Sequence, residues 1–200
     1  MPEHVRVREV GPRDGFQNEP EVIATADKVR LIDMLARTGL RRLEVTSFVR
    51  ADVIPQLADG REVLEPGQIL VDATVPLAAA VSGRATRLLG VPQGSAAQQA
   101  QEMVPDGVIV VSALHTVSGA KLGDLDHELD EDVPVMGDKR EPKKRVADLI
   151  ALIDGLRPIN AGLLEAARLV ESLTPLLISV NARHKTHAGM KLTGIPEERW

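Results

Sequence analysis

Residues 108–117 have the sequence Val-Ile-Val-Val-Ser-Ala-Leu-His-Thr-Val, an apolar run that gives way to Ser, His and Thr. A β-branched run of this kind, with Pro105-Asp-Gly107 before it and Ser118-Gly119 after it, is typical of a buried parallel strand. In open α/β sheets, ligands bind in the crevice beyond the carboxyl ends of such strands. We therefore expect His115 and Thr116 to border a ligand crevice. The alternative is a hydrogen-bonded histidine at a strand end with no ligand.

The composition narrows the class of protein. The chain has 200 residues, of which 44% are hydrophobic and 26% charged, as in an ordinary globular protein. A net charge of -5 argues against a general nucleic-acid surface, and the absence of cysteine excludes disulfides and thiolate chemistry. No apolar run reaches the ~18 residues of a membrane span, and the start has no apolar signal region. We expect a cytoplasmic protein that binds neither nucleic acid nor a membrane.

Hydrophobic periodicity predicts strands that alternate with helices along the chain. The expected strands are residues 5–10, 40–46, 68–76, 108–117, 133–137 and 156–159, and the expected helices are 25–37, 95–103, 122–129, 142–153 and 163–183, the last kinked or divided at Pro175. This alternation predicts an α/β fold with a three-layer sheet of mostly parallel strands. The composition changes at residues 64–67, so we expect two segments, 1–65 and 66–200.

The first segment carries a specific motif. Residues 9–19 are Glu-Val-Gly-Pro-Arg-Asp-Gly-Phe-Gln-Asn-Glu, and residues 43–49 are Leu-Glu-Val-Thr-Ser-Phe-Val. This segment, an expected βαβ unit, resembles the opening of the TIM-barrel enzyme 3-hydroxy-3-methylglutaryl-CoA lyase. The resemblance implies that Asp14 binds a divalent metal such as Mg²⁺, that Arg13 stabilises an enolate and that Glu44 supports the acid–base step.

The lyase resemblance covers only about 65 residues, whereas a TIM barrel needs ~250. The family's metal-binding histidine pair and loop cysteine have no counterpart in this chain. We therefore expect a lyase-like carbon–carbon lyase fragment to be the alternative function and not the leading one.

The second segment carries a longer resemblance. Its motifs are Val-Ser-Ala-Leu-His-Thr at 111–116, Asp-Val-Pro-Val-Met-Gly-Asp at 132–138, Asp-Gly-Leu-Arg-Pro at 154–158, Arg-Leu-Val-Glu-Ser-Leu-Thr-Pro at 168–175 and His-Ala-Gly-Met-Lys at 187–191. Over residues 68–196 the chain resembles the latter two-thirds of NADPH-dependent reductases of the deazaflavin coenzyme F420. The family transfers hydride between NADP and F420, which the protein holds face to face.

This resemblance assigns residues to the two cofactors. It implies that Val75 and Pro76 lie on the NADP side and that Ala188 and Gly189 contact the deazaflavin. The segment His115, Thr116, Val117, Ser118 and Gly119 would border the junction of the two rings, and Gly119 stands where the family usually has Ala. Hydride transfer needs no protein acid or base, so we expect no catalytic residue for it.

The family's dinucleotide-binding half begins with a glycine-rich turn that holds the pyrophosphate at a helix N-terminus. No G-x-G-x-x-G occurs in this chain, and the lyase-like segment stands in its place. We therefore expect a Rossmann-like reductase half with a βαβ N-terminal appendage, F420 binding and impaired NADP binding. A natural fusion, an assembly artefact and a deliberate chimera all fit the junction near residue 65. A non-catalytic α/β dimerisation module is a further alternative, and the apolar C-terminal helices suggest a homodimer in either case.

Overall fold

The computed structural model describes residues 9–40, 42–47, 51–52, 54–124 and 128–196. By its internal contacts the chain divides into two compact units. Unit 1 comprises residues 1–66 and 105–107, and unit 2 comprises residues 67–104 and 108–200.

Unit 1 is built around one helix and one parallel contact. A π-helical turn, η1 (Gly11–Gly15), precedes α1 (Thr25–Ala36), and a short 3-10 helix, η2 (Pro55–Leu57), follows. The predicted strands at 5–10 and 40–46 are represented by a single parallel bridge between Glu9 and Leu43, and residues 5–8 and 41 lie outside the described residues. The helix α1 is where the sequence predicts it, but its N-cap is Ala24. Thr25 is instead the first residue of the helix, and its hydroxyl donates a hydrogen bond to Asp59.

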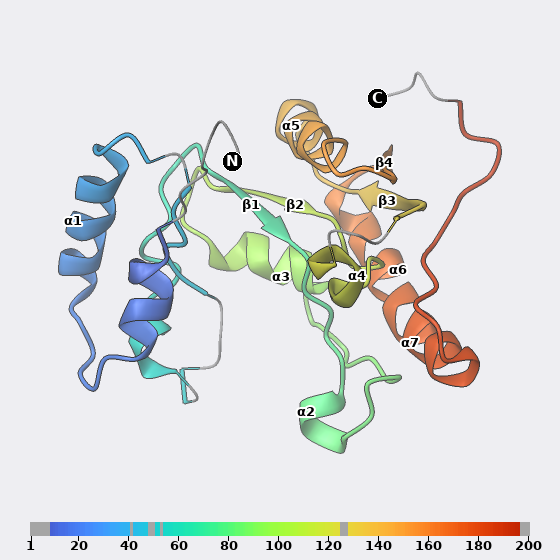
Figure 1. The fold of residues 1–200 in the computed structure, drawn as a ribbon, viewed down its shortest axis with the longest axis horizontal. Coiled ribbons are helices and arrows are strands. Elements are labelled where there is room, and N and C mark those ends of the chain that lie inside the picture. Colours follow the sequence, from blue (N-terminus) through green and yellow to red (C-terminus); the bar gives the residue numbers. More distant parts are fainter. Residues whose placement is uncertain (1–8, 41, 48–50, 53, 125–127, 197–200) are drawn as a thin grey trace, which may run out of the picture. The chain divides into compact units, whose positions relative to one another are not determined.

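Unit 2 contains all the regular strands of the described residues. β1 (Ile69–Asp72) pairs in parallel with β2 (Ile109–Ser112), and β3 (Glu131–Val135) pairs in parallel with β4 (Leu156–Asn160). Backbone hydrogen bonds between Ser112 and Met136, 2.9 Å in both directions, connect the two pairs. In Figure 1, β1 runs beside β2 and β3 lies beside β4. The parallel α/β character is thus confirmed.

Helices cover both faces of β2. Successive side chains of a strand point to opposite faces, so Val110 and Val111 pack against different helices. Val111 packs with Val146 and Ile150 of α5 (Arg140–Ile150). Val110 packs with Ala97 of α3 (Ala96–Met103) and with Ala167 of α6 (Ala167–Glu171). The strands of the described residues nevertheless pair as two two-stranded sheets, so a single three-layer sheet stays a prediction.

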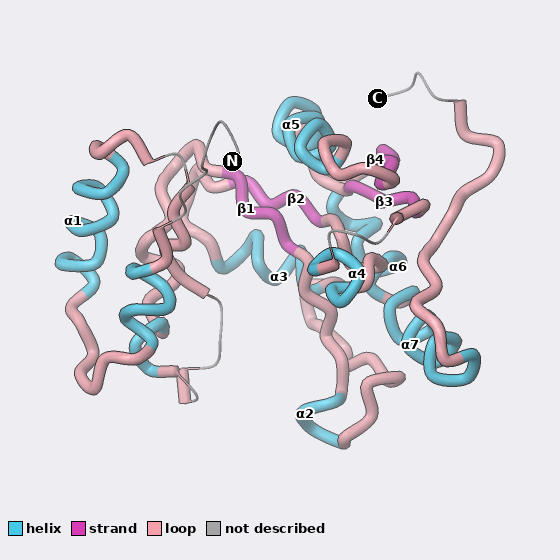
Figure 2. The backbone as a smooth tube through the Cα atoms, in the orientation of Figure 1, coloured by secondary structure: helices cyan, strands magenta, loops and turns pink. Residues whose placement is uncertain are grey.

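The remaining elements of unit 2 are three short helices and the longer α7. They are α2 (Ala79–Ser82), α4 (Gly119–Gly123), η3 (Leu164–Ala166) and α7 (Leu173–His184). Figure 2 shows that α2 interrupts an otherwise irregular connection between β1 and α3. No helix of the described residues has both the length and the apolar character needed to cross a membrane.

Two helix predictions differ from the structure in instructive ways. The predicted helix at 122–129 is instead α4, which ends at Gly123, and residues 125–127 lie outside the described residues. The predicted 163–183 helix is divided into η3, α6 and α7, but the division falls at Ser172. Pro175 then lies in the first turn of α7, where its missing N–H has no helical partner to lose.

Candidate functional site

The carboxyl ends of β1 and β2 lie side by side in unit 2. Asp72 and Ser112 are register partners at the last positions of the two strands, and the Ala113 N–H donates to the Asp72 carbonyl at 2.9 Å. Leu114 follows with a φ of 70°, a left-handed conformation that few non-glycine residues adopt. This turn reverses the direction of the chain after β2 and directs the His115 side chain into the protein.

The His115 imidazole is fully enclosed. Its side chain is 0% exposed, and its Nε2 lies 3.2 Å from the Ser112 hydroxyl and 3.9 Å from Asp72 Oδ2. Thr174 of α7 donates a hydrogen bond of 2.9 Å to the His115 carbonyl, which fixes the backbone of the turn. His115 therefore lies three residues beyond the end of β2, which stops at Ser112 and not at the predicted residue 117, and its ring is enclosed; a ligand contact of His115 stays a prediction.

Glu171 completes a buried cluster with Asp72 and His115. The three residues each offer a ligand-type atom, and these atoms lie within 4.8 Å of one another. The carboxylate oxygens of Glu171 accept the Ala96 and Ala97 N–H groups at 3.1 and 3.2 Å. Those N–H groups begin α3, so the helix terminus and the carboxylate attract each other.

The segment assigned to the junction of the two rings and the segment assigned to the deazaflavin meet in unit 2. The Ser118 hydroxyl lies 3.4 Å from Nδ1 of His187, 69 positions further along the chain. Gly119 is exposed, and a Cβ added to it would meet nothing within 4 Å. The Ala188 N–H donates to the Asn181 side chain at 2.7 Å, which ties residues 187–189 to α7. The structure therefore brings Ser118–Gly119 and His187–Gly189 together.

Gly189 lies against the buried carboxylate of Glu131. A Cβ at position 189 would lie 2.0 Å from Cδ of Glu131, so only glycine fits here without a shift. Glu131 forms an ion pair of 3.2 Å with Lys121 of α4. Its Oε2 is buried and has no hydrogen-bond partner among the described residues.

Asp132 of β3 binds the segment that follows α7. The Asp132 N–H donates to the Met190 carbonyl at 2.7 Å, and the Asp132 carboxylate accepts the Leu192 N–H. Arg157 of β4 donates two hydrogen bonds to the same carboxylate, at 2.7 and 2.8 Å. The Arg157 hydrogen bonds hold the pKa of Asp132 below its ordinary value, despite the burial of the carboxyl group.

Val75 and Pro76 follow β1 in a half-buried loop. The Pro76 carbonyl accepts the Leu89 N–H at 2.7 Å, and the Val75 carbonyl accepts the Leu77 N–H. Val75 and Pro76 follow Asp72, the last residue of β1, by three and four positions. Thr116 is buried, and its hydroxyl has no hydrogen-bond partner among the described residues, while Val117 is half-buried.

The lyase-like residues form a separate cluster in unit 1. Arg13 donates hydrogen bonds to both Asp14 and Glu44, and its Nε lies 3.1 Å from Glu44. The hydrogen bond with Glu44, together with the nearby Asp14 charge, raises the pKa of Arg13. Among the described residues, Asp14 belongs to no group of three carboxylate or imidazole side chains that could hold a metal. The motif is thus assembled among the described residues, and metal binding by Asp14 stays a prediction.

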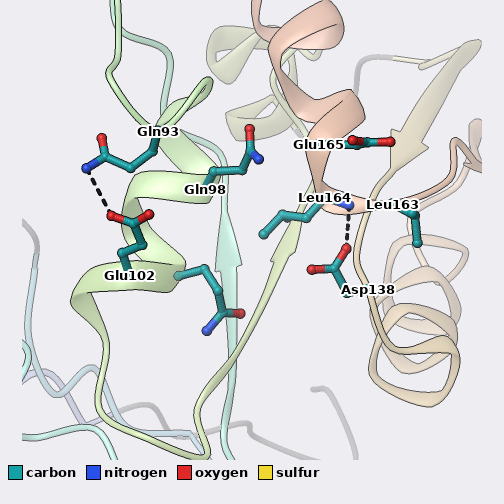
Figure 3. A pocket seen from close by; sticks show the side chains of 8 residues that line it. Gln93, Gln98, Glu102, Asp138, Leu163, Leu164 and Glu165 are labelled. Atoms are coloured by element: carbon teal, nitrogen blue, oxygen red, sulfur yellow. Dashed lines mark hydrogen bonds between the residues drawn. The ribbon is translucent and has the colours of Figure 1, made fainter.

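Two pockets in unit 2 are lined by none of the predicted cofactor residues. One, of about 330 Å³, is acidic, and Figure 3 shows Glu102, Asp138 and Glu165 around it, with Asp138 accepting the Leu164 N–H. The other, of about 440 Å³, is lined by residues of β1 and α5, among them Val71 and Leu149. Neither pocket corresponds to a crevice at the carboxyl ends of β1 and β2.

Sequence reasoning missed Asp72 and Glu171. Asp72 lies inside the predicted strand 68–76 and Glu171 inside the predicted helix 163–183, and a carboxylate in either apolar context needs a partner when it is buried. The sequence therefore shows that each carboxylate needs a partner if it is buried. It does not show which partner, because Asp72 and Glu171 are 99 positions apart and come together only in the folded chain.

Comparisons with known proteins find relatives for both segments. No family model matches the chain. The F420-dependent NADP reductase of Methanocaldococcus jannaschii is 43% identical over 130 residues, 64% of this chain and 58% of the relative. That of Methanothermobacter thermautotrophicus is 32% identical over 199 residues, 96% of this chain and 79% of the relative. The chain thus spans little more than half the length of the first of these relatives.

A solved structure and a second family complete the comparison. The crystal structure described as an F420-dependent NADP reductase from Arthrobacter sp. FB24 has a TM-score of 0.62 and 25% identity, covering 82% of this chain and 80% of the other. Mitochondrial hydroxymethylglutaryl-CoA lyase of Gallus gallus is 56% identical over 65 residues, which are 32% of this chain and 22% of the relative. The likeness to both families that the motifs indicate is confirmed.

Proposed function

The chain belongs to the F420-dependent NADP reductase family, and from this membership we propose that unit 2 binds coenzyme F420 and takes part in hydride transfer with NADP(H). The two cofactors supply the redox chemistry, since a hydride passes directly between nicotinamide and deazaflavin. The protein's task is to position the rings and to exclude water.

The deazaflavin side is assigned to Ser118–Gly119 and Ala188–Gly189. The observation that carries this assignment is the contact between Ser118 and His187, which joins two segments far apart in sequence. The open space at Gly119 suits the flat face of a ring, and the Ser118 and His187 side chains offer hydrogen bonds to ring carbonyl groups. The residues present therefore fit the deazaflavin.

The residues assigned to the NADP side fit only part of that cofactor. Val75 and Pro76 offer an apolar wall, but the chain has no glycine-rich turn that would hold a pyrophosphate. We infer that residues 1–65 stand in the place of the dinucleotide-binding half, so that NADP binding and turnover are impaired. His115, Thr116 and Val117 then act through the backbone of the turn, since the His115 ring is enclosed.

The test is a titration of the protein with F420, followed by the absorbance and fluorescence of the deazaflavin. Ser118→Ala and His187→Ala each remove one hydrogen-bonding group, and we expect each to weaken F420 binding about three- to tenfold. His184→Ala is the matched control, because His184 is an exposed histidine at the end of α7 that forms none of the hydrogen bonds described above. Wild-type protein that does not bind F420, or a His184 effect as large as that of His187, would refute the assignment.

We also propose that the protein forms a homodimer through its C-terminal region. Three leucines of the C-terminal region are more than half exposed: Leu163, Leu169 and Leu176, at 53%, 63% and 57%. Repeated exposure of large apolar side chains marks an interaction surface. Light scattering should give twice the chain mass, and Leu169→Asp with Leu176→Asp should give the monomer. A wild-type monomer at micromolar concentration would rule this proposal out.

A further inference from the structure

The buried side chains of Asp72, His115 and Glu171 have no role in the function proposed above, which uses only the backbone of His115. The three residues of this cluster are deeply enclosed: Asp72 is 6%, His115 6% and Glu171 2% exposed. Asp72 Oδ2, which lies 3.9 Å from His115 Nε2, has no hydrogen-bond partner among the described residues. Buried polar atoms without partners are rare in folded proteins, so this cluster calls for a missing partner.

The charges of the cluster indicate what that partner is. Among the described residues, no lysine or arginine forms an ion pair with Asp72 or Glu171. The carboxylate oxygens of Asp72 and Glu171 lie within 4.8 Å of each other, and two neighbouring carboxylates are costly to bury without a compensating partner. The N–H groups of α3 offset part of the charge on Glu171, but Asp72 Oδ2 has no such donor.

We propose that Asp72, His115 and Glu171 bind a divalent transition-metal ion, with Zn²⁺ as the representative. The donor set of one imidazole and two carboxylates suits Zn²⁺, whereas Mg²⁺ and Ca²⁺ prefer six or more oxygen ligands. The ligand atoms of a tetrahedral Zn²⁺ site are about 3.4 Å apart. The 3.9 Å between Asp72 Oδ2 and His115 Nε2 closes to that distance by small side-chain rotations.

The surroundings already orient the ligands. Thr74 donates a hydrogen bond of 2.8 Å to Asp72 Oδ1, which leaves Oδ2 directed into the cluster. The α3 N–H groups orient Glu171, and the Thr174 hydroxyl fixes the His115 carbonyl. Partners of this kind raise metal affinity by fixing the ligands in place. The ion would connect the ends of β1 and β2 to α6, and this role is independent of F420 binding.

The experiment titrates chelator-treated, full-length protein with Zn²⁺ in competition with a chromophoric chelator. We expect one Zn²⁺ per chain and a rise in the thermal unfolding midpoint on binding. The near-isosteric variants Asp72→Asn and Glu171→Gln should each weaken Zn²⁺ binding by at least about tenfold. His184→Gln, which changes an exposed histidine, is the control and should bind as the wild type does.

A measurement on the unaltered protein keeps the proposal testable if the variants do not fold. Imidazole NMR spectra should show Zn²⁺ shifting the resonances of His115, the buried histidine ring of the described residues, at one equivalent of metal. Absence of Zn²⁺ binding, retention of wild-type affinity in folded Asp72→Asn, or shifts confined to exposed histidines would each overturn the site. Because the readout is metal binding alone, its failure is distinguishable from a failure to bind F420.

Discussion

Replacing Gly189 with alanine tests the contact that positions the deazaflavin-side segment. The added Cβ would lie 2.0 Å from Cδ and 2.2 Å from Oε2 of Glu131, whereas carbon atoms in contact need well over 3 Å. Glu131 is 4% exposed and is paired with Lys121, so its carboxyl group can make room only by disturbing this ion pair. If the carboxyl group keeps its place, the backbone of residues 188–190 must move instead. Overpacking of this kind costs about 1–3 kcal/mol of folding free energy.

The assay is urea unfolding followed by circular dichroism, with F420 titration of the same preparations. Gly189→Ala should lower the free energy of unfolding by about 2 kcal/mol and weaken F420 binding. Gly119→Ala is the matched control, because its Cβ meets nothing within 4 Å and alanine restricts the unfolded chain. It should be neutral or stabilise by up to about 1 kcal/mol. In a Glu131→Ala background, Gly189→Ala should cost less than about 1 kcal/mol, as the clash is removed. A Gly189→Ala protein as stable as the wild type would refute the reasoning.

Two further substitutions test the local structure. The Ser95 hydroxyl caps α3 by accepting the Gln98 N–H at 3.0 Å. Ser95→Ala should therefore lower the free energy of unfolding by about 1 kcal/mol, measured by urea unfolding. An unchanged urea midpoint would contradict a stabilising role of this cap. Asp132 has a lowered pKa in the folded chain, so its contribution to stability is complete above about pH 4 and is lost as the pH falls through the folded-state pKa. Asp132→Asn should lower the free energy of unfolding by about 2 kcal/mol at pH 7, a figure discounted because Arg157 is 38% exposed. The variant should also lose less stability on acidification than the wild type does. An acid transition as steep as that of the wild type would argue against the Asp132–Arg157 pair.

Local pattern was enough to place most elements of unit 2. Ser95 as an N-cap, the apolar strand at 108–112 and the helix at 140–150 each depend on residues within a few positions of one another. The boundaries were less accurate at Gly119–Gly123, where the helix is only five residues long and periodicity has too few turns to be detected.

The candidate site was predictable only in part. Motifs placed His115 at the end of a strand, but the inward direction of its ring follows from the left-handed Leu114 and from the approach of Thr174, 59 positions away from His115. Likewise, the fit of Gly189 against Glu131 depends on the return of the chain along β3. Contacts between distant segments are products of the tertiary fold, which a local sequence pattern does not encode.

The central claim is that the chain keeps the deazaflavin side of the reductase site and lacks the phosphate-binding turn of the NADP side. The most direct measurement titrates the same protein with F420 and with NADPH in parallel by isothermal calorimetry. The account predicts saturable F420 binding at one site per chain, weakened by Ser118→Ala, and no saturation by NADPH at concentrations that saturate F420. Saturable binding of NADPH without binding of F420 would contradict it.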